Sequence, residues 1–145
     1  MSQYQFLPAL RELVRCYQAF ESLAGEHIRT LGVTPSQFDI IATLGNTQGM
    51  TFKLLGEKTL ITKGTLTGVV DRLEAKNIVQ RVASSTDGRS QIVQLTPLGE
   101  ALFAEIFPQH LEYVGRALAA MQPDELLQIQ SQLQKLRAVL DRAQS

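Results

Sequence analysis

The sequence predicts a mainly α-helical fold that carries one small β-hairpin. Apolar residues recur at spacings of three and four over most of the chain, which is typical of amphipathic helices. Hydroxyl residues stand before several of these segments, where helix caps are expected. The spacing changes to alternation around residues 78–95. With 145 residues, 44% of them hydrophobic, we expect a single domain spanning residues 1–145 with a substantial core.

Composition excludes several classes of protein. No run approaches 18 apolar residues, so no transmembrane helix is expected. The N-terminus lacks a basic segment followed by an apolar core, so we expect no secretory signal. A single cysteine, Cys16, excludes an internal disulfide and fits a reducing compartment. We therefore expect a cytoplasmic protein without a membrane partner.

Charge is distributed unevenly along the chain. The net charge is zero, which argues against a protein that coats nucleic acid indiscriminately. Residues 51–95 hold seven Lys or Arg and four acids, a net of +3, whereas both ends are acidic. This pattern favours a chain whose middle meets an anion, although a solvated surface would have a similar composition.

The first predicted helix spans residues 6–30. Its apolar positions keep helical spacing, and Gly32 marks the break after Leu31. Cys16 lies three residues from Leu13 and four from Phe20, close to the apolar face. We interpret Cys16 as a buried structural cysteine, since free cysteine is among the most buried residue types. The alternative is a redox sensor, which would need access and a lowered pKa.

Two shorter helices follow. Thr34, Pro35 and Gln37 predict a helix start with a capping box, and the helix should end around Gly45. Thr51 then caps a short helix with the sequence TFKLLGEKTL.

The stretch from Thr62 to Lys76 is the most informative part of the chain. Thr62 is suited to cap its helix, and one face should be buried through Leu66, Val69, Val70 and Leu73. The opposite face is small and polar, with Gly64, Thr65, Thr67, Gly68, Asp71 and Arg72. Each glycine costs up to about 1 kcal/mol against alanine in a helix interior. Such a face is either a close packing surface or a surface that approaches a partner such as DNA.

This stretch and the helix before it match a helix-turn-helix in outline. Residues 78–82 and 91–95 then predict two strands joined by a turn-rich tip that contains Asp87, Gly88 and Arg89. An arginine on a protruding loop can enter the minor groove of DNA, where negative potential is concentrated. The alternative is a solvated turn arginine.

The C-terminal third predicts two more helices. Thr96 and Pro97 begin the first, and Pro108 should kink or interrupt it near Phe107. The last helix begins at Pro123 and carries a narrow apolar stripe, Leu126, Ile129, Leu133, Leu136 and Leu140. A stripe of this kind is a helix–helix seam. We expect the long terminal helices to pack together and to form a dimerisation surface.

Three segments resemble the MarR family of winged-helix transcription regulators. They are LGVTPSQFDIIATLGN, LITKGTLTGVVDRLEAKNIVQR and STDGRSQIVQLTPLGE, and they run in register from about residue 31 to residue 100. The resemblance implies a winged helix-turn-helix lobe over residues 31–96 and dimerisation helices over residues 1–30 and 97–145. It also implies a homodimer on a pseudo-palindromic site of double-stranded DNA, often controlled by small anionic or phenolic ligands or by oxidants.

Carried over residue by residue, the resemblance implies a set of DNA-binding positions. They are Thr62, Lys63, Thr65, Thr67, Gly68 and Arg72 on the recognition helix, with Arg89 at the wing tip and Asp87 bracing it. Two features depart from the family pattern. Gly88 and Ser90 stand where many members carry further charge, and Cys16 is not where the sensing cysteine of the peroxide-responsive branch would fall.

The sequence thus predicts a sequence-specific DNA-binding regulator, with repression favoured. One alternative is a winged-helix protein-interaction module, which the basic centre disfavours. Another is an oxidant-responsive regulator that uses Cys16. We expect no enzyme, cofactor or metal site, because no HExxH, CxxC or glycine-rich phosphate loop is present. His27 and His110 are read as surface or helix-packing residues. Tyr17, Phe20 and His27 are candidates for an effector pocket, although a place in the core is favoured for them.

Overall fold

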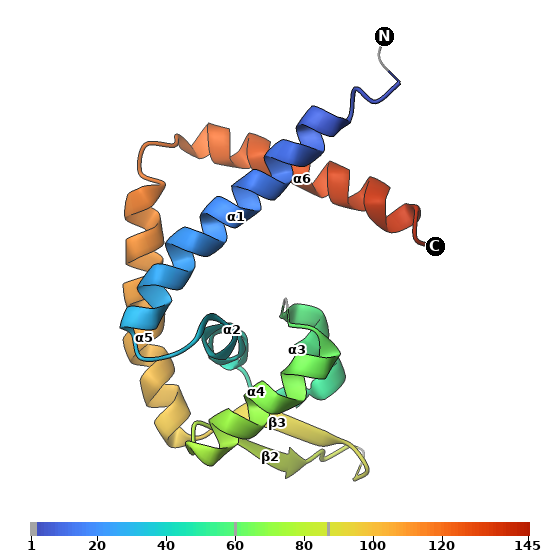
Figure 1. Cartoon of the computed structure of the whole chain (residues 1–145). Coiled ribbons are helices and arrows are strands. Elements are labelled where there is room, and N and C mark those ends of the chain that lie inside the picture. Colours follow the sequence, from blue (N-terminus) through green and yellow to red (C-terminus); the bar gives the residue numbers. More distant parts are fainter. Residues whose placement is uncertain (1–2, 60, 87) are drawn as a thin grey trace. The chain divides into compact units, whose positions relative to one another are not determined.

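The computed structural model describes residues 3–59, 61–86 and 88–145. Over these residues the fold is mainly α-helical with a small antiparallel sheet (Figure 1). The elements in chain order are α1 (Leu7–Thr30), α2 (Pro35–Leu44), β1 (Met50–Thr51), α3 (Phe52–Lys58), α4 (Lys63–Ala75), β2 (Val79–Ala83), β3 (Gln91–Leu95), α5 (Pro97–Ala117) and α6 (Pro123–Arg142). None of these helices is long and apolar enough to cross a membrane.

The predicted helix starts are confirmed by their capping hydrogen bonds. At α2, Gln37 N donates to Thr34 Oγ1 at 3.1 Å and Thr34 N donates to Gln37 Oε1 at 3.1 Å, which completes the capping box. At α3, Leu54 N donates to Thr51 Oγ1 at 3.2 Å. At α5, Gly99 N donates to Thr96 Oγ1 at 3.0 Å. These bonds satisfy backbone donors that a helix start leaves without an internal partner.

The start of α4 differs from the prediction. Thr62 occupies the N-cap position, but its side chain accepts no backbone hydrogen bond there. Its hydroxyl instead donates to Thr65 Oγ1 at 3.2 Å, one turn further along the helix. The bond between the two hydroxyls replaces the capping bond, because a threonine side chain can bond to a nearby side chain as well as to a backbone N–H.

The sheet has the strand order β1-β3-β2, with both pairs antiparallel. The predicted hairpin of β2 and β3 is confirmed, although β2 begins and ends one residue later than predicted. In its register Val79 pairs with Leu95 and Ala83 pairs with Gln91. Strand β1 was not predicted. It has only two residues, Met50 opposite Val93 and Thr51 opposite Ile92, which is too short for an alternating pattern.

The chain divides into two compact units, residues 1–112 and residues 113–145. The core lies in the first unit and is built from all its elements. Its fully buried side chains are Ile40, Ile41, Leu44, Leu55, Val70, Leu73, Val79 and Val93. Helix α4 packs on α2 and on β2, so the core holds α4 against the base of the hairpin (Figure 1). The recognition-like helix is therefore fixed by burial of its own apolar face.

One expectation about the terminal helices is wrong, and another is wrong in part. Cys16 is exposed, because the apolar side of the N-terminal part of α1 is not covered; the buried residues of α1 are Ala24, Gly25 and Ile28, near its C-terminal end. Of the two effects expected at Pro108, a kink or an interruption, the interruption is absent, because α5 continues through this residue. The side chain of Gln109, the residue after the proline, donates to the carbonyl of Glu105 at 3.0 Å.

The second unit contains the end of α5 and the whole of α6. Gln122 N donates to Glu125 Oε1 at 2.9 Å at the start of α6, where acids also complement the helix dipole. None of the residues of α6 is buried. Large apolar side chains on this helix are therefore exposed: Leu126, Leu127, Ile129, Leu133, Val139 and Leu140.

Candidate nucleic-acid interface and ligand pocket

Helix α4 has one buried face and one exposed face, as its sequence predicts. Its apolar residues Leu66, Val69, Val70 and Leu73 are each at most 4% exposed. The predicted contact residues Thr62, Lys63, Thr65, Thr67 and Arg72 are all exposed, and Gly68 is partly exposed. The structure thus exposes hydroxyl and cationic groups on both flanks of the polar side of the helix, where they are suited to phosphates and base edges.

The two glycines of α4 face open space. A methyl group added at Gly64 or Gly68 would meet no atom of the described chain within 4 Å, apart from the immediate backbone. These glycines are therefore not required for packing inside the chain. Of the two interpretations that the sequence left open, close packing within the subunit is excluded, and close approach to a partner stays a prediction.

The hairpin tip carries the predicted wing residue Arg89, which is exposed. Ser84 N donates to the carbonyl of Ser90 at 2.9 Å, and Thr86 N donates to Ser84 Oγ at 3.3 Å, so the base of the tip is closed by hydrogen bonds. Asp87, the predicted brace for Arg89, lies outside the described residues. Arg89 lies on the loop between β2 and β3, and β2 is the first element after α4 in the chain.

Sequence reasoning missed a cluster around Arg81. This side chain on β2 forms ion pairs with Asp71 and, at 3.7 Å, with Glu74, and both partners stand on α4. Its guanidinium also lies 5.3 Å from the centre of the Phe52 ring. Arg81 thereby ties strand β2 to both helices of the helix-turn-helix, and it pairs with both acids of α4. Ten residues separate Asp71 from Arg81, so only the fold of the hairpin brings them together.

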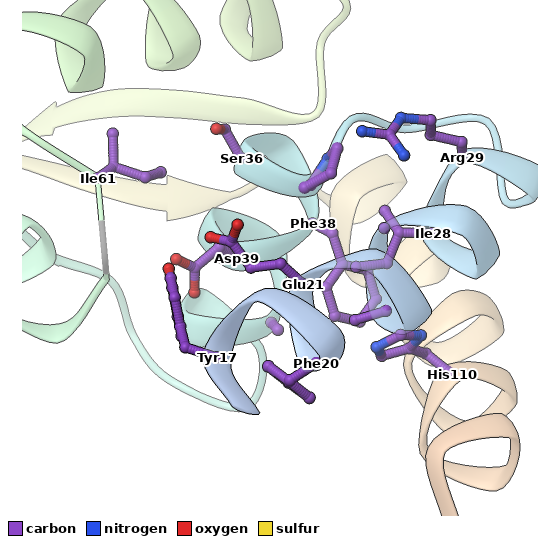
Figure 2. Close-up of a pocket in the computed structure, with 14 residues that line it drawn as sticks. Tyr17, Phe20, Glu21, Ile28, Arg29, Ser36, Phe38, Asp39, Ile61 and His110 are labelled. Atoms are coloured by element: carbon purple, nitrogen blue, oxygen red, sulfur yellow. The ribbon is translucent and has the colours of Figure 1, made fainter. Parts of the chain in front are cut away.

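A pocket of about 400 Å³ opens beside α1 and α2 in the first unit (Figure 2). Two of the three candidate effector residues, Tyr17 and Phe20, line it. Their side chains are 45% and 50% exposed, so the expectation that they belong to the core is wrong. Among the lining residues that were not predicted, four have ionisable side chains: Glu21, Arg29, Asp39 and His110. A cavity of this volume is in the range that holds small molecules.

The third candidate, His27, does not line the pocket but contacts His110, which does. Its Nδ1 lies 3.0 Å from Nδ1 of His110, and the two rings are stacked with centroids 5.2 Å apart. Phe38 meets the His110 ring edge-on at 4.7 Å. The reading of the two histidines as helix-packing residues is confirmed, since they join α1 to α5. Because one Nδ1 must donate and the other accept, the contact is incompatible with protonation of both rings.

This pair makes stability depend on pH. Burial lowers the pKa of His110, and the charge of His27 lowers it further. An unfolded histidine has a pKa of about 6.5, so as the pH falls the unfolded chain takes up this proton before the folded chain does. The contribution of His110 to the free energy of unfolding is therefore fully present above the unfolded pKa of about 6.5, and it is lost as the pH falls through the lower pKa of the folded state.

We therefore expect the urea midpoint of unfolding to be lower at pH 5.5 than at pH 7.5. His110→Phe keeps the ring packed on Phe38 but removes the titrating group, so it should reduce the difference between the two midpoints. Urea unfolding followed by circular dichroism at both pH values measures this. An unchanged difference in the variant would assign the pH dependence to other groups.

Metal binding finds no support in the described residues. They contain no group of three or more His, Cys, Asp or Glu side chains placed to hold a metal ion. Structural zinc sites take four such ligands, and catalytic ones take three together with water. The histidine pair alone falls short of that number.

Comparison with known proteins identifies the family. Residues 31–90, which run from the end of α1 to the hairpin tip, match the MarR family. The HTH-type transcriptional regulator MhqR of Bacillus subtilis is 31% identical over 114 residues, covering 79% of each chain. The chain belongs to the MarR family. Members of this family are DNA-binding transcriptional regulators and not enzymes, and DNA-binding regulation is accordingly the function of this chain.

Solved structures agree with this assignment at the level of the fold. AbsC, a MarR family transcriptional regulator from Streptomyces coelicolor, superposes with a TM-score of 0.84 at 21% identity, over 97% of each chain. BpsR of Bordetella bronchiseptica, whose DNA binding is regulated by 6-hydroxynicotinic acid, superposes with a TM-score of 0.80 at 24% identity, over 94% of this chain and 98% of BpsR. The MarR chain described here thus has the winged helix-turn-helix fold.

Proposed function

We propose that this protein is a homodimeric repressor that binds a pseudo-palindromic operator through α4 and the hairpin tip. The observation that carries the proposal is the exposed face of α4, with its hydroxyls, Lys63, Arg72 and two unobstructed glycines. Helix α4 would lie in the major groove and Arg89 would enter the adjacent minor groove. The ion pairs of Arg81 support this arrangement, because its one positive charge offsets half of the negative charge that Asp71 and Glu74 would present to phosphates.

The proposed dimer rests on exposed apolar side chains. In α6 the apolar stripe is uncovered, and the side chains of Val14 and Phe20 on α1 and of Phe6 just before it are at least 50% exposed. Apolar surface of this extent on terminal helices is typical of a protein interface. A two-fold dimer would bind half-sites about 10 base pairs apart, or a multiple of that spacing. A dimer covering a promoter would exclude RNA polymerase, which is why we favour repression.

We further propose that a small phenolic ligand in the pocket beside α1 and α2 controls DNA binding. The aromatic side chains of Tyr17, Phe20 and Phe38 in the lining suit a planar ring. BpsR, a structural neighbour, is regulated by a small aromatic acid. A ligand would release DNA only if it bound one conformation of the dimer more tightly than the other.

The test of the proposed function is a gel shift with the DNA upstream of the protein's own gene. We expect a salt-dependent complex, and we expect Arg89→Ala to weaken it by roughly 10- to 100-fold, the loss of one good groove contact. Arg142→Ala, which removes the same charge from the last turn of α6, is the matched control and should have little effect. Footprinting would locate the half-sites. A complex that is insensitive to salt, or to both Lys63→Ala and Arg89→Ala, would favour a protein-interaction module instead.

The glycines of α4 permit a second test, in which stability and DNA affinity should change in opposite directions. Gly68→Ala meets no steric obstacle within the chain, so it should raise the free energy of unfolding by up to about 1 kcal/mol. The same methyl group should lower operator affinity by roughly tenfold if the backbone approaches the groove closely. Urea unfolding and gel shifts measure the two effects.

The matched control for Gly68→Ala is Gly56→Ala on α3. There the added methyl would lie 3.5 Å from Leu66 Cδ2, an ordinary contact inside the lobe. It should change stability without a comparable loss of DNA affinity. Equal operator affinity for the wild type and Gly68→Ala would refute the account of the glycines while leaving DNA binding by α4 intact.

A further inference from the structure

The pocket beside α1 and α2 has walls of two kinds. Phe20, Phe38 and Ile28 provide apolar surface near its middle, with the ring of His110 alongside (Figure 2). Charged side chains occupy its margins. The placement of those charges bears on the charge of a ligand that the pocket could hold.

One end of the pocket is acidic. Glu21 from α1 and Asp39 from α2 lie there with the hydroxyl end of Tyr17, and Figure 2 shows the three side chains gathered together. The Tyr17 hydroxyl is hydrogen-bonded to Glu21, and this bond, together with burial and the negative charges of Glu21 and Asp39, raises the pKa of Tyr17. The carboxylates therefore act on the same point of the pocket from two different helices.

The arginine of the lining, Arg29, lies away from this acidic end. In Figure 2, Arg29 stands on the other side of Phe38 and Ile28 from Tyr17, Glu21 and Asp39. Its guanidinium lies along its own helix, because a methyl group added at Gly25 would be 3.1 Å from Nη1 of Arg29. Among the described residues, the lining thus holds two carboxylates at one end and one cation at the other, a net of one negative charge at neutral pH.

We propose that the pocket selects an aromatic ligand with a positively charged amine, whose ring packs between Phe20 and Phe38 and whose ammonium group lies between Glu21 and Asp39. An ammonium group has three donors, so it can bond both carboxylates at once. A carboxylate in the same place would face two like charges. The proposal rests on the proposed role of this pocket as the effector site. It retains an aromatic effector and adds that the effector is positively charged.

Such a ligand would also connect two helices of the first unit. Glu21 stands on α1, whereas Asp39 stands on α2, which packs against the DNA-facing helix α4. A cation bound between them would draw α1 and α2 together and so favour one arrangement of the lobe. This is the kind of differential interaction that a ligand needs in order to shift a conformational equilibrium.

Two compounds of equal ring chemistry and opposite charge test the proposal directly. Tyramine and 4-hydroxyphenylacetate share the phenol and nearly the same length, but one carries an ammonium group and the other a carboxylate. Isothermal titration of the full-length protein at pH 7 should show tyramine binding at least about tenfold more tightly, since a charge-assisted hydrogen bond contributes enough for that ratio.

Variants of the acidic end supply the second arm. Glu21→Gln and Asp39→Asn should each weaken tyramine binding by about tenfold, because each removes one charged acceptor. Glu26→Gln, an exposed acid of the same helix that does not line the pocket, is the matched control and should bind tyramine like the wild type. Thermal unfolding of each variant checks that the fold is kept.

The proposal is overturned if 4-hydroxyphenylacetate binds as tightly as tyramine, if neither compound binds, or if both acidic-end variants bind tyramine like the wild type. Its failure is separable from that of the proposed function, because operator binding is measured without ligand. If no complex with the upstream DNA forms in the gel shift, the proposed operator binding is refuted, regardless of whether tyramine binds. Tyramine binding that leaves the operator complex intact would refute effector control while supporting the assigned ligand charge.

Discussion

Leu133→Asp is expected to convert the protein from a dimer to a monomer and to lower operator affinity by roughly 100-fold or more. Leu133 belongs to the apolar stripe of α6 and is 46% exposed. A charge in the middle of that stripe would have to be buried without a partner when two copies associate. A monomer would then bind one half-site alone and lose the gain from simultaneous engagement of two, which is commonly about 10² to 10⁴.

The control is Ser131→Asp on the same helix. With about 3.6 residues per turn, Ser131 lies on the side of α6 opposite the stripe, so the same charge should leave the dimer intact. Size-exclusion chromatography with light scattering gives the mass, and the gel shift gives the affinity. A Leu133→Asp protein that stays dimeric and binds the operator normally would exclude this stripe from the interface.

Gly99→Ala is expected to lower the free energy of unfolding by about 3 kcal/mol, near the upper end of the usual cost of overpacking. An added methyl would lie 2.1 Å from the carbonyl oxygen of Ile78 and 3.1 Å from Leu95 Cδ2. The obstacle is backbone, and it cannot rotate away. Ile78 O accepts from Thr96 N at 3.0 Å and from Thr96 Oγ1 at 3.2 Å, so its movement would break bonds that start α5.

The effect should appear as a fall of about 10 °C in the melting temperature. Gly115→Ala on the same helix is the matched control, because a methyl group there meets no atom of the described chain within 4 Å. Differential scanning calorimetry of the two variants measures the contrast. Equal melting temperatures would mean that α5 can move away from the start of β2 at little cost.

Local signals in the sequence predicted most of the fold. The capping residues Thr34, Thr51 and Thr96 are short-range features, and each makes the expected bond within three residues. The burial of Leu66, Val70 and Leu73 follows in the same way from helical spacing. Strand β1 could not be predicted, because its two residues are defined by the partner strand β3 rather than by their own pattern.

The site was predicted only in part, and for a related reason. The exposed face of α4 depends on one helix and could be read from the sequence. The contact of His27 with His110 joins residues 83 positions apart, and the pairing of Arg81 with Asp71 depends on the register of the hairpin. The exposure of Cys16, Tyr17 and Phe20 was missed because an apolar helix face indicates burial, but it does not indicate whether the same chain or a partner chain buries it.

The open space around Gly64 and Gly68 has a consequence for how operator preference can change. A methyl group added at either position would meet no atom of the lobe within 4 Å, and the substitution would remove no packed side chain. In this protein two sites on the exposed face of α4 have room for a side chain, and they are natural starting points for engineering a regulator that recognises a different promoter.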